Sequence, residues 1–243
     1  MRLITHFAKQ HFSQLGLLAS LAVGGLAVAP AAQAGAINFF TCNGKPATIL
    51  ATAGDDTIAG TRGDDVIMAF TGNDTIYGYG GNDTICGGDG DDTIFGGDDD
   101  DTIFGGMGND FLQGNKGSDK LYGSFSMTDG PLVQGGDDML YGGPGNDYLD
   151  GWNSTRVVYA DGGDDRDVIY GSPNDDVLHG GAGDDYIDAL WGHNTLYGES
   201  GDDYLESDTS PSFLNGGTNT AVGDECEEDP GSTYIGCERL EDE

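Results

Sequence analysis

The chain repeats itself every nine residues, and this period constrains its fold more than any other feature of the sequence. An aliphatic residue, two positions after an Asp, recurs at a constant step of nine through the first half of the chain. These residues are Ile58, Ile67, Ile76, Ile85, Ile94, Ile103, Leu112 and Leu121. Tandem units of this length are typical of solenoids, in which each unit stacks on its neighbours.

Each unit also carries a Gly four residues before the aliphatic residue and an Asp two residues before it. The Gly series is broken once in the first eight units, at Asp99, whereas the Asp series is unbroken. One unit can be numbered from Gly87 to Phe95. This numbering places Gly at positions one, two and four, Asp at position six, and the aliphatic residue at position eight.

The repeat is interrupted in the second half of the chain. Residues 125–134 form an insertion, after which the step of nine resumes at Leu140. Val158 keeps the step, although Arg156 stands where Asp is expected, and we predict another short insertion near Arg166. The repeat then continues through Ile169, Leu178, Ile187, Leu196 and Leu205.

The units at the two ends of the array are degenerate. Ile49 and Leu214 keep the step of nine, but their units lack the Asp. Repeat arrays need atypical ends to cover the exposed faces of the stack. We therefore expect an N-terminal cap at residues 35–50, the repeat array at 51–206, and a C-terminal cap at 207–243.

The most regular units, Gly87–Phe95 and Gly105–Gln113, resemble the RTX or hemolysin-type calcium-binding repeat, whose pattern is GGxGxDxUx. The resemblance covers about residues 51–206. It implies an all-β fold, a parallel β-roll with two nonapeptide repeats per turn and two facing sheets. It also implies that each Ca²⁺ ion lies between turns one rung apart.

The residue types suit calcium. Gly permits positive φ and lets backbone carbonyls converge, and Ca²⁺ takes six to eight oxygen ligands. Turn carbonyls and Asp carboxylates supply such a set, for roughly ten ions in the whole chain. The candidate metal ligands are Asp56, Asp65, Asp74, Asp83, Asp92, Asp101, Asp110, Asp119, Asp138, Asp147, Asp165, Asp176, Asp185 and Asp203. Asn194 replaces Asp in one unit, so we expect weaker sites there.

The net charge of −34 makes a compact fold without bound cations unfavourable. Because 37% of the residues are hydrophobic and recur at a fixed spacing, neutralisation by cations is favoured over disorder. We expect metal binding and folding to be coupled. Nucleic acid is excluded as a partner, because its binding depends on Lys and Arg contacts to phosphate.

The first 34 residues have the pattern of a secretory signal peptide. Arg2 and Lys9 precede an apolar run from Leu15 to Ala29, and Ala32-Gln33-Ala34 fits a cleavage site. The run is too short for a membrane span. The sequence therefore predicts a secreted, extracellular protein with no membrane span after cleavage.

Four Cys residues follow this leader, an even number that favours disulfides in an exported chain. Cys226 and Cys237 close a short loop and are expected to pair. Cys42 would then pair with Cys86 by elimination.

The sequence contains no nucleophile elbow and no HExxH motif, so we predict no enzyme. Strand alternation places position eight inward and positions seven and nine outward. The outward aromatics Tyr77 and Phe95, or Tyr186 and Tyr204, would stack on one sheet. The alternative function is an extracellular adhesin that binds a cell-surface glycan or protein, with structural calcium. A third hypothesis is a small hydrolase or epimerase that uses the carboxylates of the array.

Overall fold

The computed structural model describes residues 40–124, 135–208, 211–218, 223–227, 231–237 and 239–241. The expected leader at 1–34 and the insertion at 125–134 lie outside the described residues. Within the described part the chain forms strands and turns, with no helix long and apolar enough to cross a membrane.

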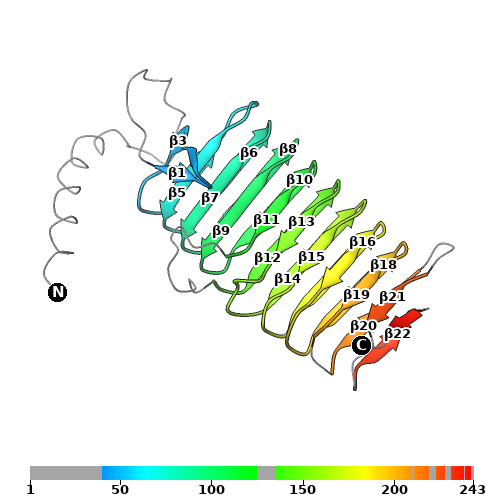
Figure 1. The fold of residues 1–243 in the computed structure, drawn as a ribbon. Coiled ribbons are helices and arrows are strands. Elements are labelled where there is room, and N and C mark those ends of the chain that lie inside the picture. Colours follow the sequence, from blue (N-terminus) through cyan, green and yellow to red (C-terminus); the bar gives the residue numbers. More distant parts are fainter. Residues whose placement is uncertain are drawn as a thin grey trace, which may run out of the picture.

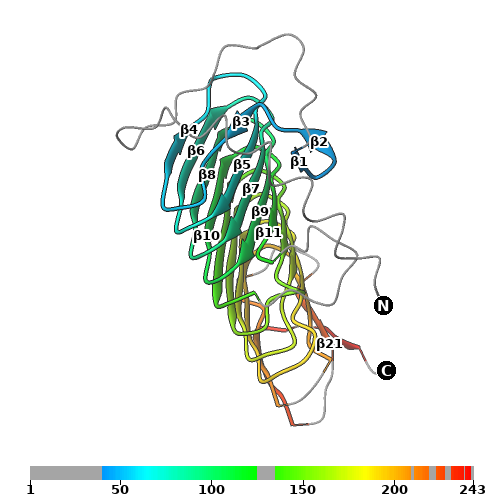
Figure 2. The ribbon, with the colours of Figure 1, turned by 90° about the vertical axis from the view of Figure 1, so that its left-hand side faces the viewer.

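Two parallel sheets face each other along the length of the molecule (Figures 1 and 2). The sheet that we call the even sheet contains β4 (Thr57–Ala59), β6 (Thr75–Gly80), β8 (Thr93–Asp98), β10 (Phe111–Lys116), β12 (Asp138–Pro144), β14 (Val158–Asp164), β16 (Val177–Ala182), β18 (Thr195–Ser200), β20 (Phe213–Asn215) and β22 (Thr233–Ile235). The odd sheet contains β3 (Ile49–Leu50), β5 (Val66–Thr71), β7 (Thr84–Asp89), β9 (Thr102–Met107), β11 (Lys120–Tyr122), β13 (Tyr148–Asp150), β15 (Val168–Tyr170), β17 (Tyr186–Asp188), β19 (Tyr204–Glu206), β21 (Glu225–Glu227) and β23 (Arg239–Glu241).

Consecutive units alternate between the sheets, so each strand pairs with the strand two units away. Ile58 pairs with Ile76, and Ile76 pairs with Ile94, in parallel register. One turn of the solenoid therefore contains two nonapeptide units, and the predicted parallel β-roll is confirmed. We call the turns that lead into even strands the even edge, and those that lead into odd strands the odd edge.

The core is a double row of aliphatic side chains between the sheets. Position-eight residues from Ile49 to Leu205 are at most 1% exposed, as the alternation predicted. The row is one large side chain wide in each sheet, because position one, the other inward position of the strand, is Gly or Ala in each unit of the array. The apolar core is thus long and thin.

Glycine serves two different purposes in the turns. In regular turns such as residues 105–110, positions two and four have positive φ, 128° at Gly106 and 119° at Gly108. Position one is crowded rather than left-handed: a Cβ on Gly78 would lie 2.4 Å from the carbonyl oxygen of Gly96 in the next turn. Glycine at position one is therefore favoured by the close approach of neighbouring turns.

Disulfides link cysteines near both ends. Cys42 of the short hairpin β1 (Thr41–Cys42) and β2 (Lys45–Pro46) is bonded to Cys86 on β7, and Cys226 is bonded to Cys237. Both predicted pairings are found. The strands β20 to β23 continue the two sheets past residue 206.

One prediction of register is wrong. Val158 pairs with Asp138, and Ala160 is the residue that pairs with Leu140 and points into the core. The extra residues therefore lie in the turn 151–157, and none is inserted near Arg166, because Ala160 and Ile169 are nine residues apart. The small side chain of Ala160 concealed this slip, since Val158 offered a larger aliphatic residue at the expected step.

The outward aromatics stack as predicted. The rings of Tyr77 and Phe95 lie 5.2 Å apart at 7°, and those of Tyr186 and Tyr204 lie 5.2 Å apart at 1°. Rings on the same face of neighbouring strands contribute to sheet stability.

Candidate metal centre

Position six of each unit forms a ladder of hydrogen bonds along each edge of the solenoid. The backbone N–H of one position-six residue donates to Oδ1 of the next one along the same edge, for example from Asp83 to Asp101 at 2.8 Å. On the odd edge this ladder is continuous through Asp65, Asp83, Asp101, Asp119, Asp147, Asp167, Asp185, Asp203 and Asp224. On the even edge it joins Asp56, Asp74, Asp92, Asp110 and Asp138.

The second oxygen of many of these carboxylates is buried and accepts no hydrogen bond. Such Oδ2 atoms belong to Asp74, Asp83, Asp92, Asp101, Asp110, Asp119, Asp147, Asp167, Asp185 and Asp203. Each of these residues is at most 2% exposed. A buried carboxylate oxygen without a donor is strongly unfavourable, so each of these atoms requires a partner that the chain itself does not supply.

In most open turns a backbone carbonyl of the next turn along the same edge points to the same space as this Oδ2 atom. A Cβ on Gly180 would lie 2.5 Å from Oδ2 of Asp185 and 2.9 Å from the carbonyl oxygen of Gly198. At Gly142 the corresponding distances, to Asp147 and Gly162, are 2.3 and 2.4 Å. Two acceptors that face one small space, with no donor between them, make a cradle for a cation.

The electrostatics of the buried carboxylates are equally unfavourable without a cation. Burial raises the pKa of Asp101 to about 8. The carboxylates of Asp119 and Asp83 add to the rise, and the backbone hydrogen bond from Asp83 opposes it. Burial likewise raises the pKa of Asp110 and Asp167 to about 8. A bound cation would favour the ionised form of these groups.

No basic side chain neutralises the buried ladder among the ion pairs of the described residues. Those pairs are Lys116 with Asp98, Arg156 with Asp137, and His179 with Glu199, none of which includes a position-six residue. Within the same part of the chain, no three His, Cys, Asp or Glu side chains gather into one metal site. A cation in a turn would therefore be held by few carboxylates and completed by backbone carbonyls.

In four candidate ligands, Oδ2 accepts a hydrogen bond from a donor within the chain. The N–H groups of Thr52, Thr61 and Ser172, at position two, donate to Oδ2 of the Asp in the same turn at 2.6–2.8 Å. The Asp residues of these turns are Asp56, Asp65 and Asp176. In the fourth case, Oδ2 of Asp138 accepts hydrogen bonds from two serine hydroxyls. We call these turns closed, and those with an unpartnered Oδ2 open.

The backbone at position two separates open from closed turns. In every open turn the position-two residue has positive φ, as at Tyr79, Gly97 and Glu199. In the closed turns position two is Thr or Ser, without positive φ. The left-handed residue turns its N–H away from the carboxylate, and this leaves Oδ2 without a donor.

Asp165 does not take the predicted place. It lies at position four, where its φ is 80°, and is exposed. Asp167 takes position six, is 0% exposed, and accepts the N–H of Asp147 at 2.8 Å. The misplaced insertion near Arg166 explains the error, because the correct register puts position six two residues before Ile169.

A second ladder was missed by the sequence analysis. At position five the N–H groups donate in the opposite direction, to the Asp or Asn side chain one turn earlier. Asn73 donates in this way to Asp55, and Asn109 donates to Asp91. The frequency of Asp and Asn at position five is the signal in the sequence that could have indicated this ladder.

Comparison with protein families identifies the repeat. Seven segments match the model of the RTX calcium-binding nonapeptide repeat, which spans four copies, and together they cover more than half of the chain. They are residues 50–85, 80–112, 104–125, 134–155, 161–196, 170–205 and 192–209. No curated protein matches the chain.

Proposed function

Because this chain belongs to the family of RTX calcium-binding nonapeptide-repeat proteins, we propose that its open turns hold Ca²⁺ and that this binding drives the chain to fold. One observation carries the proposal: the buried Oδ2 atoms of the open turns have no donor. Ca²⁺ prefers carboxylate and carbonyl oxygens, which are the atoms that converge there. Bound Ca²⁺ supplies positive charge and does no redox chemistry.

The proposed ligands are the carboxylates of the open turns together with carbonyls of the same and adjacent turns. They are Asp74, Asp92 and Asp110 on the even edge, and Asp83, Asp101, Asp119, Asp147, Asp167, Asp185 and Asp203 on the odd edge. One ion per open turn would give roughly ten ions. Such ions would offset a large part of the net charge of −34.

The thin core supports the coupling of binding to folding. A single row of large inward side chains in each sheet buries little apolar area per residue. Without cations, this burial would not offset the unfavourable free energy of the ionised carboxylates in the ladder. We infer that the chain is largely unfolded when calcium is absent at neutral pH.

Circular dichroism of the full chain, titrated with Ca²⁺ after removal of metal, tests this function. A cooperative change from coil to β-structure with Ca²⁺, and none with the same concentration of Mg²⁺, is expected. Mg²⁺ is the matched control because it demands a stricter octahedral shell and dehydrates reluctantly. A chain that is already β-folded without metal, and binds no Ca²⁺, would overturn the proposal.

We also propose that the protein works outside the cell, as the N-terminal pattern suggests. The two disulfides support this location, because disulfides persist in oxidising compartments. Millimolar calcium outside cells would fill sites of modest affinity. A catalytic function is not part of the proposal, because the carboxylates that could act as acid and base are engaged in the buried ladder.

A second function is favoured by one surface feature. Tyr77, Tyr79 and Phe95 line a shallow groove on the outer side of the even sheet, together with Gln113 and Lys116. Aromatic faces beside polar side chains could bind a glycan or a protein partner. Replacement of Tyr77 and Phe95 by Ala should then abolish binding to a glycan array and leave Ca²⁺ uptake unchanged. Equal glycan binding by the variant and the unaltered chain would remove this second function.

A further inference from the structure

After Asp110 the two edges of the solenoid differ in whether their turns are open. The odd edge continues as open turns through Asp147, Asp167, Asp185 and Asp203. The even edge has no open turn between Asp138 and Ser212, among the residues that the structure describes. Each even turn in this stretch satisfies its position-six residue in a different way.

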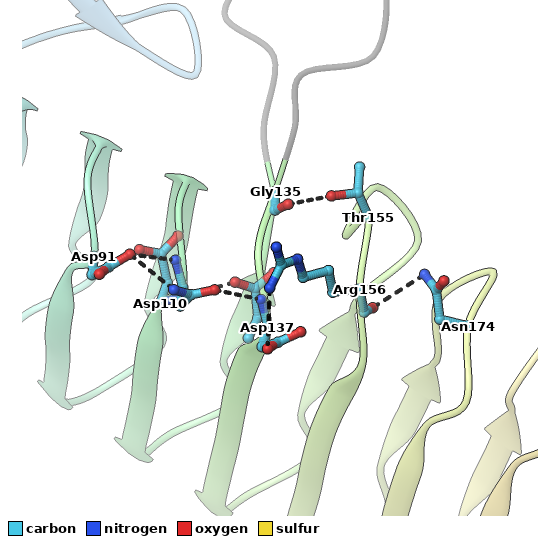
Figure 3. Close-up of polar contacts among 9 residues, drawn as sticks. Asp91, Asp110, Gly135, Asp137, Thr155, Arg156 and Asn174 are labelled. Atoms are coloured by element: carbon cyan, nitrogen blue, oxygen red, sulfur yellow. Dashed lines mark hydrogen bonds and ion pairs between the residues drawn. The ribbon is translucent and has the colours of Figure 1, made fainter.

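The first two of these turns have no position-six carboxylate oxygen that lacks a hydrogen-bond donor. Oδ2 of Asp138 accepts hydrogen bonds from the hydroxyl groups of Ser154, at 2.5 Å, and Ser124, at 3.4 Å. In the next turn Val158 takes position six, so an apolar side chain, 0% exposed, replaces the carboxylate. On the outside of this turn Arg156 lies 3.9 Å from Asp137 (Figure 3).

The following turn is closed by Ser172. Its N–H donates to Oδ2 of Asp176 at 2.6 Å, and its hydroxyl donates to Oδ1 at 2.8 Å. The hydroxyl also lies 2.9 Å from the carbonyl oxygen of Arg156 in the preceding turn. A single serine thus contacts the carboxylate and a turn carbonyl, the two kinds of oxygen that a cation would bind in an open turn.

Asn194 offers the clearest case, because its turn has the backbone of an open one. Leu190 at position two has a φ of 56° and Gly192 at position four has a φ of 109°. The amide oxygen of Asn194 keeps the ladder, accepting the N–H of Asp176 at 2.9 Å. Its amide nitrogen lies 3.2 Å from two carbonyl oxygens of its own turn, those of Ala189 and Trp191. The NH₂ group therefore donates to turn carbonyls where an Asp would present a second acceptor.

We propose that the even edge from Asp138 to Ser212 takes no Ca²⁺, because its turns are closed by the chain's own hydrogen-bond donors or, at Val158, lack the carboxylate. The C-terminal half of the roll then binds calcium along the odd edge alone. This inference rests on the proposed function of the open turns. It divides the molecule into an N-terminal half with cations on both edges and a C-terminal half with cations on one edge.

The substitution Asn194→Asp tests the inference, because it changes one NH₂ group to oxygen in a turn whose backbone is already of the open type. Alanine at position one, as at Ala189, is compatible with an open turn, since Ala69 precedes Asp74 in the same way. We expect N194D to bind one more Ca²⁺ per chain than the unaltered protein, measured by equilibrium dialysis with metal analysis. Tb³⁺ in place of Ca²⁺ should also gain luminescence excited through the adjacent Trp191.

The matched control is Asp185→Asn, the reverse exchange in the neighbouring open turn of the odd edge. This variant should bind at least one ion fewer. Ser172→Gly is the second test, because a Gly at position two permits the left-handed conformation of the open turns and removes the hydroxyl donor; it should gain one ion at Asp176. Circular dichroism in saturating Ca²⁺ verifies that each variant folds.

The outcomes separate the two proposals. If the unaltered chain binds no Ca²⁺, or D185N binds as much as it does, the proposed function of the open turns is wrong. If the unaltered chain binds Ca²⁺ and D185N loses it, but neither N194D nor S172G gains an ion, the closed edge is wrong.

Discussion

The backbone N–H of Asp83 donates to Oδ1 of Asp101, one turn further along the odd edge, at 2.8 Å. This bond fixes one oxygen of the Asp101 carboxylate and leaves Oδ2 buried without a donor. The same relation repeats in each open turn, so carboxylates stack at the strand spacing of about 4.8 Å. The ladder therefore orders the ligands and at the same time creates the repulsion that a cation relieves.

The burial of these carboxylates, together with the repulsion between them, predicts how pH affects the calcium-free chain. The pKa of Asp101, Asp110 and Asp167 in the fold is raised from 3.8 to about 8. The folded state therefore binds protons more tightly than the unfolded state. The resulting stability is fully present below about pH 4 and is lost as the pH rises towards about 8. Calcium-free protein should show more β-structure by circular dichroism at pH 5 than at pH 8.

Saturating Ca²⁺ provides the comparison for this experiment. Ions would keep the carboxylates of the ladder ionised, so the calcium-loaded chain should not lose stability between pH 5 and pH 8. Greater stability at pH 8 than at pH 5 in the absence of calcium would contradict the electrostatic account of the open turns.

Much of the fold could be predicted because the period of nine is strict. Position eight is buried from Ile49 to Leu205 because alternation along short strands leaves it no other side. The register failed at Val158, where two aliphatic residues, Val158 and Ala160, competed for the inward position. Only the pairing of strands decides between them, and pairing is not visible in one sequence.

The sequence predicts the position-six Asp residues as one class of candidate ligands, and their binding of metal stays a prediction. It does not separate the turns whose Oδ2 has no donor from those whose Oδ2 accepts a hydrogen bond. That difference depends on the φ of position two and on donors from residues such as Ser154, which is 16 positions from Asp138. The first factor has a local signal, because Thr or Ser at position two accompanies the closed turns of Asp56 and Asp176. The second factor depends on the backbone conformation of a longer turn, which the nonapeptide pattern does not predict.

The thin core predicts a strong effect of shortening an inward side chain. Leu112 is 0% exposed between the sheets, whereas Leu50 on β3 is 39% exposed. Leu112→Ala should lower the free energy of unfolding of the calcium-loaded chain by about 2–5 kcal/mol, from lost burial and the cavity left behind. Leu50→Ala is the matched control and should cost less than about 1 kcal/mol. Denaturant unfolding measures both, and equal losses would contradict the assigned register.

The disulfide between Cys42 and Cys86 predicts that the N-terminal cap is tied to the second turn of the roll. The bond spans 44 residues and includes the whole first turn. Replacing both cysteines by Ser should lower stability by about 2–4 kcal/mol, mainly by freeing the unfolded chain. The pair Cys226 and Cys237 spans 11 residues, so its removal should cost less. Thermal unfolding in Ca²⁺ compares the two variants, and a larger loss from the C-terminal pair would contradict this ordering.

Asp119→Asn should change stability in opposite directions with and without calcium. Asp119 is 1% exposed, and burial raises its pKa to about 6, so without metal at pH 8 its charge destabilises the fold. An amide removes that charge and can still accept the N–H of Asp101, so the metal-free variant should be the more stable protein. In saturating Ca²⁺ the lost ligand should instead cost about 1–3 kcal/mol.

The control is Asp100→Asn, at the exposed position five. This variant should bind as many ions as the unaltered chain, and its change in stability should have the same sign with and without Ca²⁺. Urea unfolding in Ca²⁺, and the fraction of β-structure by circular dichroism without Ca²⁺, compare both variants with the unaltered chain. The same sign for D119N in the two conditions would show that Asp119 does not hold a cation.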